Sequence, residues 1–211
     1  MRNMQNKVGV LLGSVALVCV LGLCEARAAQ TFNNATDFIA ALGTNSYYLN
    51  NFSDLNGSGA PLISYSDTPL GSVTFSYTIS APPDGLYFIA PGGNPAPQTY
   101  TGSDPLVVTF TSGNVTAVAG NFWMTDGLGD TVSGTVTVNL SDGTQVVLPS
   151  NPSSFVGFTS ATPSIYITSL NVVSDGSHYA TIDNLIVAAP EPATLVLAGM
   201  GAAALLLFRR K

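Results

Sequence analysis

The side chains best suited to chemistry in this sequence are aspartates and asparagines, whose oxygen atoms are the ligands that Ca²⁺ prefers. Asp126 and Asp130 frame a short glycine-rich loop, and Asp183 is followed at once by Asn184. Neither stretch has the ligand spacing of an EF-hand loop. Asp126 and Asp130 are therefore candidate ligands of one structural calcium site and Asp183 of another, although aspartate also simply stabilises turns. Three residues of an early strand are expected beside Asp183: Asn50, Asn51 and Asp54.

The sequence offers few of the residue combinations that catalytic sites need. His178 is its single histidine, and no G-x-S-x-G elbow accompanies it to suggest a serine hydrolase. A zinc site needs three or four histidine, cysteine or carboxylate ligands. Glycosidases need two carboxyl groups facing each other across a cleft, whereas most aspartates here fall in turn-like stretches. The sequence therefore predicts a non-catalytic protein, with a glycan-active enzyme as a distant alternative.

Aromatic side chains offer another kind of site, because exposed rings stack on sugars. Trp123 is the single tryptophan and is the candidate ligand-binding residue, with Tyr87, Tyr100 and Tyr179 as other options. By strand alternation Trp123 lies in a row with alanines and valine, which favours a place in the core. Ice binding would need a flat, regular threonine array, and the alternating threonines here indicate ordinary solvent-facing strands.

Charge is sparse and segregated. Only 9% of residues are charged, and the twelve acids include ten aspartates between Ala28 and Pro190. All six cations lie in the flanks: Arg2, Lys7, Arg27, Arg209, Arg210 and Lys211. Phosphate binding depends on Lys and Arg, so nucleic acid is excluded as a partner of the central region. Negative charge of this kind also keeps an exported protein soluble.

The first 28 residues have the pattern of a secretory signal peptide. Two cations precede an uncharged apolar stretch from Val8 to Leu23, and Ala26 and Ala28 form an A-x-A cleavage pattern. We predict a signal helix over residues 1–28 with cleavage after Ala28. Lipidation of Cys24 is an alternative, but Leu23 is larger than the residue that normally precedes a lipidated cysteine. Both cysteines lie in this leader, so the mature chain has no disulfide or thiolate site.

The last 22 residues form a second apolar segment. Ala193 to Phe208 is uncharged, and as a helix it would rise about 24 Å, somewhat short of a hydrocarbon core of about 30 Å. The cations that follow it would stay on the cytoplasmic side, leaving the rest of the protein outside. Small and apolar residues cover every face of this helix, which argues against a core helix. We predict a single hydrophobic helix that anchors the chain in a membrane.

These residues also carry a resemblance. Pro190, Glu191 and Pro192, the short apolar helix, and the terminal Arg209 and Arg210 together resemble the PEP-CTERM sorting signal of Gram-negative bacteria. The resemblance implies recognition by an exosortase, a membrane transpeptidase-like enzyme, and an association with exopolysaccharide production. The same tag has also been labelled the C-terminal domain of ice-binding proteins, a label that describes the tag alone.

The body between the flanks, residues 29–189, is predicted to be one all-β domain. Residues 33–43 form the single short helix, capped by Asn34 or Thr36 and ended by Gly43. About ten short strands follow, many with one apolar and one hydroxylated face, which is typical of an antiparallel β-sandwich or jelly roll. Residues 141–144 are expected to form a hairpin turn, and residues 91–102 a loop. The body also resembles the β-sandwich bodies that often precede this tag.

We therefore expect an exported, non-catalytic β-sandwich that is held by a membrane helix before processing and then lies at the cell surface or in the extracellular matrix. The alternative is a calcium-dependent carbohydrate-binding module for exopolysaccharide. An ice-binding protein is a more distant alternative.

Overall fold

The computed structural model describes residues 29–43, 45–56, 58–68, 73–90, 95–162 and 165–190. The predicted signal helix and the predicted C-terminal hydrophobic helix lie outside these ranges. No helix within them is long and apolar enough to span a membrane.

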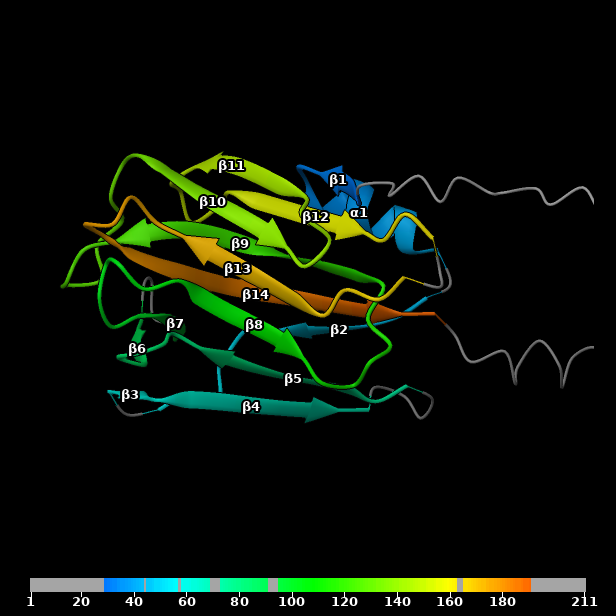
Figure 1. Cartoon of the computed structure of the whole chain (residues 1–211), viewed down its shortest axis with the longest axis horizontal. Helices are drawn as coiled ribbons and strands as arrows, with labels where there is room; N and C mark the ends of the chain where they lie inside the picture. Colours follow the sequence, from blue (N-terminus) through cyan, green and yellow to red (C-terminus); the bar gives the residue numbers. More distant parts are fainter. Residues whose placement is uncertain are drawn as a thin grey trace, which may run out of the picture.

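The described residues form two antiparallel sheets and one helix, which confirms the predicted all-β sandwich (Figure 1). In these residues the larger sheet has eight strands: β1 (Gln30–Phe32), β2 (Ser46–Asn50), β3 (Gly59–Ala60), β6 (Leu86–Ile89), β7 (Ala96–Thr99), β9 (Ala117–Thr125), β12 (Phe155–Thr159) and β14 (Tyr179–Ala189). The smaller sheet has six: β4 (Leu62–Asp67), β5 (Phe75–Ser80), β8 (Leu106–Phe110), β10 (Thr135–Leu140), β11 (Gln145–Pro149) and β13 (Ser169–Val173).

Strands distant in sequence are neighbours in both sheets. The larger sheet runs β1-β12-β9-β14-β7-β6-β3, with β2 also paired to β14, and the smaller runs β11-β10-β13-β8-β5-β4. The long central strands β9 and β14 pair antiparallel from Thr125 and Tyr179 at one end to Ala117 and Ala188 at the other. This pair forms the spine of the larger sheet and fixes which loops meet at each end of the molecule.

The main core lies between the sheets, where the apolar faces predicted from alternation meet. From the smaller sheet it takes Phe75, Tyr77 and Ile79 of β5, while Phe122 and Ile182 come from the larger sheet. Alternation positions one face of each strand inward, and burial of that face drives the two sheets together. Within the described residues this core runs from Ala29 to Ala189, and a chain of this length is large enough to bury a domain core of its own.

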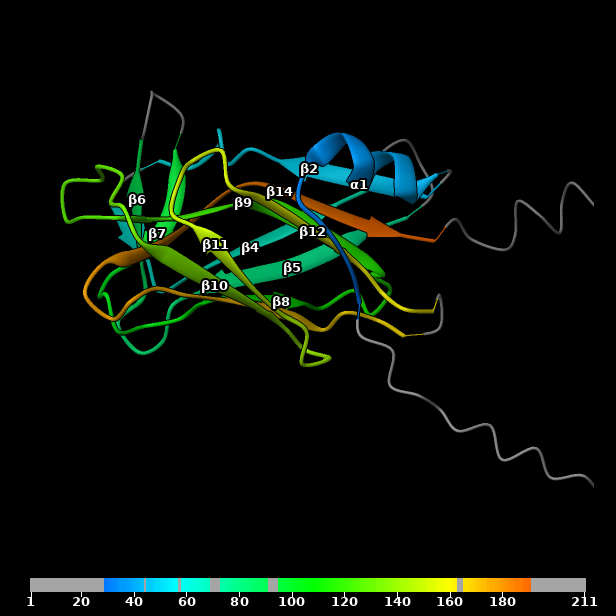
Figure 2. The same cartoon turned by 90° about the horizontal axis from the view of Figure 1, so that it is seen from above.

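Helix α1 (Ala35–Leu42) lies on the outer face of the larger sheet (Figure 2). The Asn34 side chain accepts a hydrogen bond from the Asp37 N–H and caps the helix, and Gly43 ends it with a φ of 60°. Phe38 and Leu42 pack against a second apolar cluster with the outward side chains of β9 and β14. The predicted helix is confirmed at both caps.

Two predicted boundaries differ from the structure. The alternating sequence of residues 131–140 predicts one strand, but β10 begins at Thr135 because Gly134, with a φ of 146°, interrupts the extended backbone. The loop expected over residues 91–102 contains β7, whose Pro97 lacks the N–H that a strand normally donates. Proline hid this strand, which is held instead by pairing with β6 and by the buried Gln98.

Candidate functional site

The sandwich has two chemically different ends. Strand β14 runs from Tyr179 to Ala189, a length of about 33 Å at 3.3 Å per residue. We call the end near Tyr179, with residues 100–105, 126–134 and 174–178, the loop end. We call the end where Gln30 and Pro190 lie the exit end. In Figure 1 the loop end is on the left and the exit end on the right.

The acidic loop of the loop end is closed by its own hydrogen bonds. Asp126 Oδ1 accepts from the Leu128 N–H at 2.8 Å and from the Asp130 N–H at 3.0 Å. The Asp126 N–H in turn donates to the Asp130 carbonyl at 2.9 Å. One oxygen of Asp126 is thus used to hold the turn, as an aspartate in a turn commonly does. Among the described residues, no group bonds to the Asp130 carboxylate, which is exposed.

Asp130 faces a hollow shared with an aromatic side chain. The hollow has a volume of about 370 Å³, and Tyr87 of β6, which is 38% exposed, also lines it. Gly129 has a φ of 85°, and a Cβ atom added to it would lie only 3.1 Å from Ile89 Cγ2, so the position leaves little room for a side chain. The full lining is Tyr87, Phe88, Ile89, Ala90, Leu128, Gly129 and Asp130. An exposed ring and a carboxylate that line one hollow can stack on the face of a sugar ring and accept a hydrogen bond from a sugar hydroxyl.

Trp123 does not contribute an exposed ring to this hollow. It is 1% exposed and packs with Ile89 and Ala96 in a small cluster of its own. Its side chain lies on the outer face of the larger sheet, on the same face as Ala117 and Ala119. Trp123, Ala117 and Ala119 are therefore buried outside the main core, whereas Val115 of the predicted row belongs to it. Tyr87, unlike Trp123, is exposed and lines the hollow.

Asp183 lies apart from the acidic loop. It pairs with Asn121, five residues along β9 from Asp126, which is a separation of about 16 Å. No group of three or more His, Cys, Asp or Glu side chains suited to a metal occurs among the described residues. Asp126 and Asp130 therefore share one candidate site, and Asp183 belongs to another part of the surface.

The expected neighbours of Asp183 have other partners. Asn50 is opposite Leu185 on the inner face, where its Nδ2 donates to the Tyr77 hydroxyl at 2.7 Å. Asn51 Oδ1 accepts from the Ser53 N–H, and Asp54 accepts from the Tyr65 hydroxyl. These side chains stabilise the chain that follows β2 and do not join Asp183.

Asp183 and Asn184 instead form a β-bulge, which sequence reasoning missed. The register with β9 shifts by one residue between Asp183 and Ile186, and Asn184 has a φ of 51°. Asn184 Nδ2 donates to Asn121 Oδ1 at 3.2 Å, and burial raises the pKa of Asp183. Two polar residues in succession within an apolar strand were the available signal. The amides line a second hollow, of about 450 Å³, with Asn33, Asn34, Ala35, Asn121, Pro152, Ser153, Phe155 and Asn184.

His178 has a carboxylate partner but no nucleophile among the described residues. Its Nδ1 lies 2.7 Å from Asp175 Oδ2, and both side chains are partly exposed. A hydrogen bond from the Ser177 N–H, and then the one from His178, hold the pKa of Asp175 below its usual range. No hydroxyl group among the described residues is bonded to the imidazole. The pair closes its own turn at the loop end.

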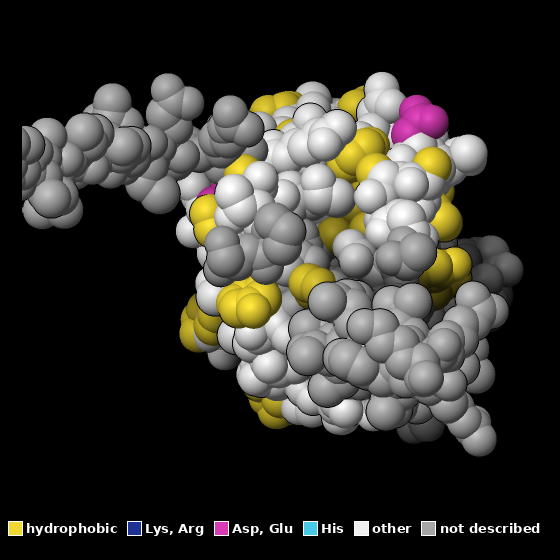
Figure 3. Space-filling view, turned by 90° about the vertical axis from the view of Figure 1, so that its right-hand side faces the viewer, with side chains coloured by type: hydrophobic (Ala, Val, Ile, Leu, Met, Phe, Trp, Pro, Cys, Tyr) yellow, Lys and Arg dark blue, Asp and Glu magenta, His cyan; other side chains and the backbone are white. Residues whose placement is uncertain are grey.

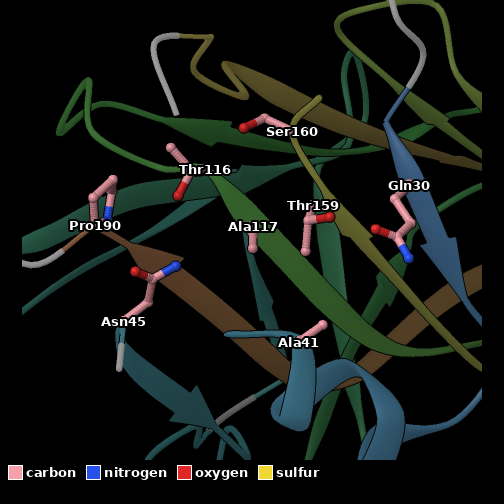
Figure 4. A pocket seen from close by; sticks show the side chains of 8 residues that line it. All are labelled: Gln30, Ala41, Asn45, Thr116, Ala117, Thr159, Ser160 and Pro190. Atoms are coloured by element: carbon pink, nitrogen blue, oxygen red, sulfur yellow. The ribbon is translucent and has the colours of Figure 1, made fainter. Parts of the chain in front are cut away.

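The exit end is built around a hollow of about 280 Å³ (Figure 4). Its walls come from the starts of β1 and β9, the ends of β12 and β14, the last turn of α1 and the residue before β2. The lining is Gln30, Ala41, Asn45, Thr116, Ala117, Thr159, Ser160 and Pro190. Figure 3 looks at this end, where hydrophobic side chains are scattered among polar ones and no Lys or Arg appears among the described residues. Gln30 and Pro190, which border the two flanks, line the same hollow.

Comparison with protein families identifies the segment that begins at the exit end. Residues 188–211 match the PEP-CTERM protein-sorting motif. The chain carries a PEP-CTERM sorting motif. This confirms the resemblance drawn from residues 190–211 and indicates an exported protein that an exosortase-type enzyme sorts to the cell surface. The first two residues of the PEP-CTERM match, Ala188 and Ala189, are the last two of β14, so the motif begins inside the folded sheet.

Other comparisons add little to the PEP-CTERM match. A search of curated proteins gave no match. Among solved structures, the chain is similar to an exo-β-1,3-galactanase from Phanerochaete chrysosporium, determined with galactose, at 16% identity and a TM-score of 0.29. The similarity covers 69% of this chain and 29% of the galactanase chain.

Proposed function

We propose that this chain is a non-catalytic β-sandwich protein of the cell surface or extracellular matrix, delivered there by its PEP-CTERM motif. The observation that carries the proposal is the continuity of β14 with the motif, which ties the folded body directly to the sorting signal. Because Glu191 follows Pro190 at once, an enzyme that acts at residues 190–192 would work within a few residues of the sheet. The predicted membrane helix would hold the body outside until that step.

Support for a non-catalytic role comes from how the carboxylates are spaced. Asp126 is bonded within its own turn, Asp175 pairs with His178, and Asp183 lies in a bulge on another strand. Within the described chain, these side chains are not brought to opposite sides of one cleft, which a two-carboxylate hydrolase requires.

The sorting proposal is tested by export of the full chain in a host with and without an exosortase gene. Surface protease digestion and fractionation would locate the body. We expect the complete chain to reach the surface only with the exosortase, and a chain lacking residues 190–211 to be exported but not retained. A control with Arg2 and Lys7 unchanged but Arg209 and Arg210 replaced by glutamine tests the motif alone. Identical fractionation of all three chains would contradict the proposal.

A second candidate function is calcium-dependent carbohydrate binding, for which exopolysaccharide is the expected ligand. The observation that favours it is the hollow formed by Tyr87 and Asp130 at the loop end. Since the PEP-CTERM motif leaves from the opposite end, an anchored body would present this hollow away from the membrane. The free Asp130 carboxylate and the backbone carbonyls of its loop are suitable calcium ligands.

This candidate is tested by retention of the body, residues 29–190, on a panel of polysaccharides in calcium and then in EDTA. We expect the body to be retained in calcium and released in EDTA. Tyr87→Ala and Asp130→Asn should each weaken this retention. Tyr47→Ala is the matched control, because Tyr47 is similarly exposed but lies on β2. Equal retention of the Tyr87 and Tyr47 variants, or none on any polysaccharide, would leave the structural surface role.

A further inference from the structure

The backbone nitrogen of Ala29 lies in a polar cradle that is better matched to a chain terminus than to a peptide bond. Its N–H points at two acceptors, Asp142 Oδ2 and Thr144 Oγ1, each at 3.1 Å. An amide nitrogen carries one hydrogen to share between them, whereas an ammonium group carries three. A carboxylate and a hydroxyl together are suitable partners for a charged amine.

The side chain of Ala29 is also held in place, by packing in the main core. Ala29 is 7% exposed and belongs to the main core, and β1 begins at the next residue, where Gln30 pairs with Thr159. The position of the nitrogen is therefore set by packing on one side and by strand pairing on the other. It does not depend on the cradle alone.

The two acceptor residues, Asp142 and Thr144, are held in place by their own turn. Asp142 and Thr144 belong to the turn between β10 and β11, in which Gly143 has a φ of 87°. The Thr144 N–H donates to Asp142 Oδ1 at 2.8 Å, which leaves Oδ2 for Ala29. One aspartate thus closes the hairpin with one oxygen and receives Ala29, 113 residues away in sequence, with the other.

Charge makes this contact distinctive. Between Ala28 and Phe208 the sequence has no Lys or Arg. Cleavage after Ala28, as the Ala26-x-Ala28 pattern predicts, would make the α-amino group of Ala29 the first fixed cation of the body.

We propose that the Asp142–Thr144 turn is a binding site for the chain's own new N-terminus: signal cleavage after Ala28 converts the Ala29 amide into an ammonium group that pairs with Asp142. Hydrolysis of the Ala28–Ala29 peptide bond adds one water, leaving a carboxylate on the leader and the ammonium on the body. The pair then fastens β1 to the hairpin of the other sheet. This inference rests on the proposed export through the N-terminal leader.

The contact is tested by thermal unfolding of the body, residues 29–190, made either with Ala29 as its first residue or with one glycine added before Ala29. The added glycine restores an amide at Ala29 and moves the charge. We expect the added glycine to lower Tm by about 3 °C, and Asp142→Asn to abolish that difference. Asp126→Asn, which alters another aspartate that holds a turn, should preserve it.

Two results would overturn the proposal. One is an equal Tm with and without the added glycine, and the other is an undiminished difference in the Asp142→Asn background, which would make the effect steric. N-terminal sequencing of the exported full chain is an independent test of where the leader is cleaved. Ala29 as the first residue supports the proposal, and any other first residue refutes it. Failure of the sorting assay with Ala29 still first would affect the proposed function alone.

Discussion

The Phe38 ring of α1 lies directly against the backbone of Gly157 in β12, with no side chain between helix and sheet. A Cβ atom placed on Gly157 would be 2.8 Å from Phe38 Cγ and 3.0 Å from Cε2. Phe32 and Phe155 meet the same ring edge-on at 5.7 Å and 6.0 Å between centroids. Helix α1 is thus docked partly through a buried ring that needs a glycine beneath it.

Gly157→Ala should therefore destabilise the body by about 1–3 kcal/mol, the usual range for overpacking a filled site. Urea unfolding of residues 29–190 measures the change. Gly127→Ala is the matched control, since its added Cβ would meet Tyr179 only at 3.7 Å and more. Equal stability of the Gly157 variant and the unaltered body would contradict this account of helix docking.

Tyr77→Phe should cost about 1–3 kcal/mol, because it leaves the buried Nδ2 of Asn50 without its partner. Tyr65→Phe removes a hydroxyl of a half-buried side chain that bonds to the exposed Asp54 at 3.3 Å and also interacts with Asn50, and it should cost less. Chemical denaturation of both variants gives the comparison. If the Tyr65 variant lost as much as the Tyr77 variant, burial of the Asn50 bond would not be the cause.

Asp183→Asn should raise the stability of the body at neutral pH. Burial raises the pKa of Asp183, so the folded state favours the neutral carboxyl group. That preference is fully present below the unfolded pKa of about 3.9 and is lost as pH rises through the folded value. The gain in Tm should therefore appear above this window and shrink below it. A gain that does not change with pH would point to another cause.

Asp175→Asn should have the opposite sign. Hydrogen bonds from Ser177 and His178 lower the pKa of Asp175, so its contribution is present above about pH 3.9 and lost as pH falls through the folded value. The effect should be small because the pair is exposed. Tm measured from pH 2 to pH 7 tests it. The loss should vanish at the acid end, and a loss that persisted there would exclude an ionic origin.

The calcium-dependent candidate makes a further prediction for the Asp126–Asp130 loop. At about one hundred times its dissociation constant, a bound ion adds about 2.7 kcal/mol to folding stability. We expect calcium, compared with EDTA, to raise the Tm of the body and Asp130→Asn to remove the rise. Magnesium at the same concentration serves as the control ion. The same Tm in calcium and in EDTA would argue against any site in this loop.

Local patterns account for the parts of the fold that could be predicted. In β5 every second residue is apolar, so Phe75, Tyr77 and Ile79 identify the inward face without any knowledge of the partner strand. The cap at Asn34 and the stop at Gly43 depend only on a few adjacent residues. The sorting motif could be predicted for the same reason, because it is a contiguous segment. The family match to residues 188–211 confirms it.

The sites could not be predicted in this way. Tyr87 and Asp130 line one hollow because Gly129 packs against Ile89 of β6, and the pairing of β14 with β9 places Asp183 beside Asn121 rather than Asp126. Strand alternation correctly grouped Trp123 with buried residues. It could not show that Ile89 and Ala96 are the residues that bury the Trp123 ring.

The sequence by itself determined the segments that are defined by adjacency: the sorting motif, the short helix and the alternating strands. Only the tertiary structure decided which aspartate meets which partner, and that both flanks border the same end of the sandwich. The reason is physical. Alternation and capping act between near neighbours, whereas the contact of Ala29 with Asp142 is set by the pairing of strands and the packing of two sheets over more than a hundred residues.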